Sequence, residues 1–187
     1  MKSFAVTLLF SIWFGAGVPA GDRLQKLIVV AENGWRLYSP PDKSFTVQVP
    51  VTPLTDADTY DAFDKSTTSG WKPIHSYVAI ASLDEPRVYF VSVFEAQSAT
   101  RENQIDEFIQ ELFKSKHLTS SKQINMNRRR VREFTLASKD TDENQFMRVR
   151  LIEVGQRIYM LTYVTNTADD VYSRSAEKFF TSFQIKR

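Results

Sequence analysis

Arginines are the residues in this sequence whose spacing most suggests chemistry, namely the binding of anions. Six of them fall on, or directly before, two neighbouring predicted strands: Arg128, Arg129, Arg130, Arg132, Arg148 and Arg150. If the outward faces of the two strands coincide, five or six guanidinium groups share one surface. Such a surface would bind an anionic polymer, a lipid head group or an acidic protein. The favoured interpretation is instead ion pairing with Glu133, Glu153 and the acidic turn at 140–143.

The two histidines, His75 and His117, do not predict a metal site. Neither has a second ligand at the spacing that helical zinc motifs use. His117 is expected at the C-terminal end of a helix, where a cation is favourable. The sequence contains no cysteine, which excludes disulfides, thiol catalysis and metal sites built on thiolates. We therefore predict no metal and no cofactor.

Two other patterns could do chemistry, and both match their templates poorly. Four aspartates between 56 and 64 suggest a calcium loop. In the EF-hand template, however, Tyr60 occupies the third ligand position and Thr67 the twelfth. A solvated loop is favoured over a calcium site. The G-x-S-x-G motif of a hydrolase is missing from the sequence, so a hydrolase is the least favoured functional class.

The elements that must position these residues are mostly strands. Alternating apolar and polar residues predict two hairpins and three further strands. The predicted ranges are 35–38, 44–49, 75–82, 88–94, 130–137, 145–154 and 157–164, with a short final strand within 182–185. The strand at 157–164 is apolar on both faces and is expected near the centre of its sheet. The strand at 145–154 is expected to be buried on one face and wet on the other, and 52–73 is predicted to be a long surface loop.

Two helices complete the predicted elements. Thr100 can cap the first helix, whose apolar residues occupy relative positions 0, 3, 4, 7 and 8: Ile105, Phe108, Ile109, Leu112 and Phe113. That spacing places them on one face of an amphipathic helix. The second helix is predicted from about 168 to 180, and Thr167 starts it. Strands with two helices predict the α+β class.

The first twenty residues resemble a secretory signal peptide. Lys2 precedes an uncharged segment at 3–20, which ends in small residues around Pro19. Its most apolar part, 4–14, is shorter than the roughly 20 residues that cross a bilayer. We expect cleavage after Ala20, a leader at 21–34, and a single monomeric domain at 35–187 in the periplasm or outside the cell. The formal net charge of +2 gives no indication of nucleic-acid binding.

Several phrases of the sequence resemble one family. They are WRLYSPP at 35–41, SFTVQVP at 44–50, VREFTL at 131–136, MRVRLIEVGQRIYMLTY at 147–163 and KFFTSFQI at 178–185. This pattern resembles the superfamily of the PsbP-type extrinsic photosystem subunit and its secreted bacterial relatives of unknown function. The resemblance implies a central antiparallel sheet flanked by helices in an α/β/α sandwich. In characterised relatives this fold docks onto a larger assembly, and no functional residue is carried over from them.

Three functions follow from these observations. The first is an exported, non-enzymatic interaction domain that docks onto another macromolecule through a sheet face or the 52–73 loop. The alternative is an anion-binding module, using the six arginines to bind a polyanion, an acidic lipid surface or an acidic partner. A hydrolase with an unusual site is third. Trp35 and Trp71 flank loops and could anchor a partner, although packing against the sheet edge is favoured.

Overall fold

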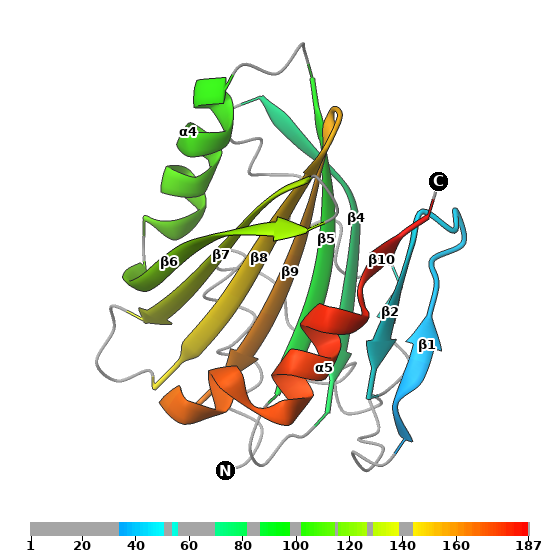
Figure 1. The fold of residues 1–187 in the computed structure, drawn as a ribbon, viewed down its shortest axis with the longest axis vertical. Helices are drawn as coiled ribbons and strands as arrows, with labels where there is room; N and C mark the ends of the chain where they lie inside the picture. The colour runs from blue at the N-terminus through cyan, green and yellow to red at the C-terminus, as the bar shows by residue number, and fades with distance from the viewer. Residues whose placement is uncertain are drawn as a thin grey trace, which may run out of the picture.

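The computed structural model describes residues 34–50, 54–55, 70–81, 87–97, 102–114, 116–126, 129–138 and 144–186. The predicted signal peptide and nearly all of the leader lie outside this part of the chain. So do the four aspartates of the proposed calcium loop, Arg128 and the acidic turn at 140–143. The described residues form two antiparallel sheets and two α-helices (Figure 1).

The larger sheet has seven strands in the order β3-β4-β5-β9-β8-β7-β6. In chain order their bounds are β3 Leu54–Thr55, β4 Trp71–Ile80, β5 Val88–Ala96, β6 Lys116–Met126, β7 Arg129–Ser138, β8 Phe146–Val154 and β9 Arg157–Thr165. β9 lies fourth of the seven strands, which confirms its predicted central position. Gly155 in the turn between β8 and β9 has φ +59°, a conformation that glycine adopts without steric cost.

The smaller sheet joins the two ends of the described chain. β1 (Arg36–Tyr38) and β2 (Phe45–Val49) form the predicted first hairpin, and β10 (Gln184–Ile185) pairs with the other side of β2. Apolar residues of β2 pack in one cluster with residues of the larger sheet. The smaller sheet therefore packs against a face of the larger one (Figure 1).

The two helices cover opposite faces of the seven-stranded sheet. α4 (Glu102–Phe113) packs its buried Phe108 against Trp71 and Phe94. α5 (Arg174–Ser182) packs Phe179 against Tyr89 on the other face. Alternation along each strand supplies both cores, because successive side chains point to opposite faces. The α+β class and the central antiparallel sheet flanked by helices are confirmed.

The predicted helix at 168–180 is two helices. A 3-10 helix, η3 (Ala168–Tyr172), precedes α5, and Ser173 lies between them with extended backbone angles. The backbone N–H of Ala176 donates to Ser173 Oγ at 3.3 Å, so Ser173 is the N-cap of α5. Thr167 makes no capping hydrogen bond through its side chain. The spacing of apolar residues in this segment does not reveal the break between the two helices. The break occurs at Ser173, which caps α5.

Candidate interaction site

The open edge of the larger sheet is β6, a strand of 11 residues. It pairs with β7 on one side, and no described strand pairs with its other side. The side chains from His117 to Gln123 are all exposed, including 55% of Leu118. A bulge between Leu118 and Ser120 interrupts the register. The Thr119 hydroxyl donates to the Thr135 carbonyl at 2.9 Å, which holds the bulge on β7.

A groove lies between β6 and α4 on the α4 face of the sheet. It encloses about 420 Å³. α4 contributes Asp106 and Ile109, β6 contributes Ser121 and Gln123, and β7 contributes Arg132 and Phe134. The groove thus has one helical wall, one edge-strand wall, and lining that is both polar and apolar.

Lys122 and Arg132 are the cations among the residues that line this groove, and Arg132 lies between two carboxylates. Its Nη1 donates to the exposed Asp106 of α4, and its Nε lies 3.5 Å from a carboxylate oxygen of Glu153 on β8. The Arg132 side chain remains 24% exposed. The pairing with Glu153 is the one that the favoured interpretation of the arginines predicted.

Arg148 and Arg150 lie on the other face of the sheet, beneath α5. In the β7–β8 register Arg150 is opposite Glu133, whereas Arg132 is opposite Leu151. Directly opposite residues share a face and adjacent residues alternate, so Arg132 points away from the other two. The alternative in which all of these arginines share one outward surface is therefore wrong for Arg132, Arg148 and Arg150. The wet face expected for 145–154 is also wrong, because Arg148 and Arg150 are only 2% and 7% exposed.

Glu133 holds these buried arginines in place. Its Oε2 accepts from Arg150 Nε at 2.9 Å and from Arg150 Nη2 at 2.6 Å. Its Oε1 lies 3.0 Å from Arg148 Nη2 and 2.8 Å from Lys122 Nζ. Burial acts to raise the pKa of Glu133, but the three surrounding cations outweigh burial and hold that pKa below its usual value. One ionised carboxylate therefore pairs with three cations, two of them buried.

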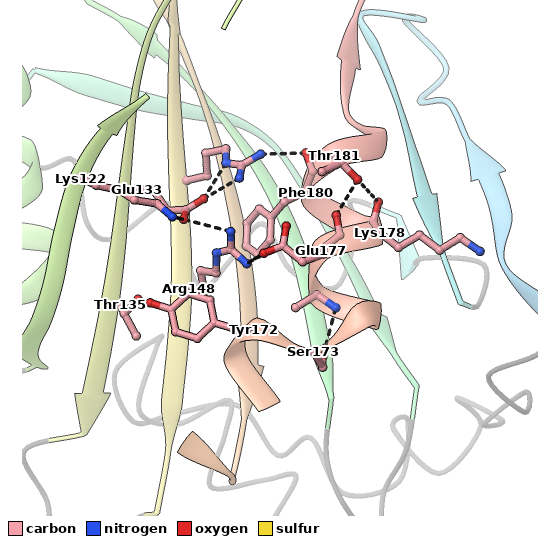
Figure 2. A network of polar contacts seen from close by, with 12 residues as sticks. Lys122, Glu133, Thr135, Arg148, Tyr172, Ser173, Glu177, Lys178, Phe180 and Thr181 are labelled. Carbon is pink, nitrogen blue, oxygen red and sulfur yellow. Dashed lines mark hydrogen bonds and ion pairs between the residues drawn. The ribbon is translucent and has the colours of Figure 1, made fainter. Parts of the chain in front are cut away.

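The same arginines fasten α5 to the sheet. Figure 2 shows Arg148 between Glu133 on β7 and Glu177 on α5, and its Nη1 donates to Glu177 at 2.6 Å. Arg150 Nη1 donates to the backbone carbonyl of Phe180 at 3.0 Å. Both guanidinium groups stack over the Phe180 ring at 4.8–4.9 Å. These contacts give both arginines a structural role, through the pairing with Glu133 that the favoured interpretation predicted.

Two further predicted arginines, Arg129 and Arg130, are the first two residues of β7. Arg129 is partly buried and Arg130 is exposed. In the register they are opposite Met126 and Asn125 of the edge strand. Arg129 and Arg130 thus lie beside the C-terminal end of β6, whereas Glu133 lies further along β7, opposite Lys122. An anion-binding role for them stays a prediction.

A second polar cluster fixes η3 to the sheet through Asp170. Its Oδ2 accepts from Tyr163 Oη at 2.6 Å, from Arg87 Nε at 3.0 Å and from Thr165 Oγ1 at 3.2 Å. Burial acts to raise the pKa of Asp170, but these donors outweigh burial and hold that pKa below its usual value. Burial and Asp170 together raise the pKa of the Tyr163 hydroxyl. The cluster is an ionised carboxylate satisfied by three donors.

Acid is expected to weaken this cluster. A carboxyl group whose pKa is lowered by folding contributes its stabilisation fully above its unfolded-state pKa, about 4, and loses it as the pH falls through the folded-state pKa. Asp170→Asn should therefore make the free energy of unfolding fall less steeply below about pH 4. Urea unfolding of both proteins at stepped pH measures this difference. Equal slopes would contradict the assigned role of Asp170.

The structure also describes the surroundings of His117, Trp71 and Trp35. His117 is the second residue of β6, and α4 has already ended at Phe113, so the expected helix-end position is wrong. Trp71 is buried, and Trp35 packs edge-to-face on Tyr89. Trp71 is thus not at a loop: it begins β4, within the range predicted as the 52–73 loop, and its ring packs on Phe108 of α4. Within the described ranges, no three histidine or carboxylate side chains gather as metal ligands.

The prediction missed β6 itself. Its sequence, KHLTSSKQINM, shows no regular alternation of apolar and polar residues, because solvent surrounds both faces over most of its length. β-Branched and polar residues ahead of the predicted 130–137 strand were the available signal. Only its pairing with β7 identifies it as a strand.

Comparison with known proteins found similar solved structures but no similar family profile or curated sequence. The solution structure of cyanobacterial PsbP (CyanoP) from Synechocystis sp. PCC 6803 is similar, with a TM-score of 0.54 at 10% sequence identity. The similarity covers 92% of this chain and 98% of that one. The protein has the PsbP-like fold.

Two further solved structures are similar to this PsbP-like chain. Protein PA94 of unknown function from Pseudomonas aeruginosa gives a TM-score of 0.49 at 14% identity, covering 82% of this chain and 97% of its own. A protein from Bacteroides thetaiotaomicron VPI-5482 gives 0.49 at 10% identity, covering 82% of this chain and 49% of its own. None of the described helices of the PsbP-like fold is long and apolar enough to span a membrane.

Proposed function

We propose that this protein is an exported, non-enzymatic interaction domain that binds a partner protein by accepting an added strand along β6. The observation that carries the proposal is that no described strand pairs with the outer side of β6. This strand has 11 residues, and the side chains of 117–123 are exposed on both faces of the sheet. An edge strand has backbone N–H and C=O groups that no neighbouring strand satisfies. An extended segment of a partner can pair with them, which is a common mode of peptide recognition.

The opposite edge of the sheet supports the choice of β6. There the last strand is β3, which has only two described residues. Short strands offer few groups for pairing, and proteins often protect their edges in this way. β6 gives a partner more than five times that length. The 11-residue edge is therefore the better template for an added strand.

The polar clusters support a non-enzymatic role. Glu133, Arg148 and Arg150 are buried and contact one another or α5. Asp170 and Tyr163 are hydrogen-bonded to each other. These charged groups act in holding the layers together, which accounts for their burial without any substrate. Export rests on the signal-peptide pattern of the first twenty residues.

Site-directed photocrosslinking tests the docking edge. Benzoylphenylalanine at His117 or Ser121, both exposed on β6, should give the same covalent adduct in cells that export the protein. The matched control places the same group at Arg174, which is exposed at the start of α5. Mass spectrometry of the adduct identifies the partner. Equal adducts from all three positions, or none from β6, would overturn the proposed edge.

A further inference from the structure

The groove between α4 and β6 lies directly beside the docking edge. β6 forms one of its walls through Ser121 and Gln123, and α4 forms the other through Asp106 and Ile109. A strand added to β6 extends the sheet by about 4.8 Å beyond that wall. Its side chains on the α4 face would then lie next to the groove. Their chemistry can be inferred from the groove and from the charge of β6 and β7.

Charge on this hairpin is strongly one-sided. The described residues of β6 and β7 include two lysines and three arginines against the single carboxylate of Glu133. That carboxylate is buried and faces α5, where Arg148 and Arg150 surround it. β6 itself carries no acidic residue and two lysines, the buried Lys116 and the half-exposed Lys122, whose Nζ lies 2.8 Å from Glu133. The edge is therefore basic, and acidic side chains complement it.

Arg132, in the lining of the groove, already pairs with a carboxylate of this chain. The carboxylate of Asp106 occupies one side of its guanidinium, although that carboxylate is more than half exposed. The contact with Glu153 is longer, at 3.5 Å. An exposed ion pair contributes little to stability, about 0–1 kcal/mol, so exchange of Asp106 for another carboxylate costs little. Asp106 thus shows that the guanidinium of Arg132 can pair with a carboxylate at this position in the groove.

We infer that the partner segment is an extended acidic peptide, paired with β6 and placing one carboxylate on Arg132 in the α4 groove. This inference rests on the proposed docking function and adds the chemistry of the partner. A second copy of this chain does not meet the requirement, because it would bring another basic edge against the first. Lysines on an edge strand commonly prevent such self-pairing, and an acidic strand is the partner that they favour.

Binding of two model peptides tests the inference. One alternates threonine and glutamate over the length of β6, and the other alternates threonine and lysine. NMR spectra of the labelled protein should show that only the glutamate peptide shifts the amides of β6 and α4. Amide exchange of β6 should slow when it binds, because an added strand protects outward N–H groups. Affinity should fall as salt is added.

Substitutions of Arg132 and of its partner Asp106 should change the affinity for the glutamate peptide in opposite directions. Arg132→Gln should weaken binding of the glutamate peptide by about fivefold, since a charge-assisted contact is lost. Asp106→Asn should strengthen binding by about threefold, because the competing carboxylate is removed. In the Arg132→Gln background Asp106→Asn should give no gain, as expected for coupled residues. Lys72→Gln, an exposed cation of β4, is the matched control and should change little.

Several results would overturn the inference. They are equal binding of the lysine peptide, no binding of the glutamate peptide, or an Asp106→Asn variant that binds no tighter. Tighter binding to phosphatidylglycerol vesicles than to the peptide, lost in Arg132→Gln, would assign the basic edge to lipid instead. If crosslinks from β6 persist while the glutamate peptide fails to bind, the acidic partner is wrong and strand addition stands. If crosslinks fail as well, both proposals fall.

Discussion

Glu133→Gln is expected to lower the free energy of unfolding by about 3–5 kcal/mol, because it removes the carboxylate that pairs with the buried Arg150 and leaves the buried Arg148 with Glu177 as its counter-charge. Arg150 makes two hydrogen bonds to this carboxylate, and Arg148 pairs with it at 3.0 Å. Both guanidinium groups lie beneath α5, where water cannot replace the lost carboxylate. Urea unfolding followed by circular dichroism measures the change.

The matched control is Glu153→Gln, on the neighbouring strand. The Glu153 side chain is 17% exposed, and its carboxylate pairs with the partly exposed Arg132. A loss of about 1 kcal/mol or less is expected there, as for pairs that water screens. Replacing Glu133 together with Arg148 and Arg150 by apolar residues of similar size should recover much of the stability. A Glu133→Gln variant as stable as Glu153→Gln would show that the buried cluster does not hold α5.

Phe179→Ala is expected to cost about 3–5 kcal/mol, the range for large-to-small changes in a packed core. The ring is 0% exposed and contacts Tyr89 edge-to-face at 5.3 Å. It also lies 5.2 Å from the Phe180 ring that stacks on the arginines. Removing it opens a cavity at the point where α5 meets the sheet. Thermal and urea unfolding measure the loss.

Phe113→Ala on α4 is the matched comparison. Phe113 is only partly buried and contacts Phe134 at 5.2 Å. Its loss should cost about 1–2 kcal/mol, because less apolar surface leaves water on folding. If Phe113→Ala is the more costly variant, α4 is the helix that anchors the fold. The expected order makes α5 the anchor.

This difference between the helices bears on the docking edge. α5 is fixed by the buried Arg148 and Arg150, which contact Glu177 and the Phe180 carbonyl, and by a buried aromatic core. α4 also packs Phe108 on the sheet, but its contact with Arg132 across the groove is made by the exposed Asp106. A partner strand can replace that contact without disturbing the buried cluster. If β6 is the docking edge as proposed, the contacts of α5 serve stability and the α4 groove serves binding.

The arrangement of the arginines could be predicted only in part. Favouring Glu133 and Glu153 as partners was correct, since residues close in a hairpin pattern meet across strands. Which face each arginine occupies depends on strand register. A shift of one residue moves every side chain to the other face. Register follows from the pairing of whole strands, so the sequence pattern around 128–150 could not separate Arg132 from Arg150.

Local pattern in the sequence by itself determined the α+β class, the two hairpins, the central place of β9 and the amphipathic α4. In each of these, one chain segment carries its own periodic signal. Tertiary structure alone decided that β6 is an edge strand, that α5 buries Arg148 and Arg150, and that a groove opens beside Arg132. These features depend on contacts between segments distant in the sequence. The exposure of each side chain and its ion pairs at such contacts depend on which other segments pack on that face of the sheet. No single segment contains this information.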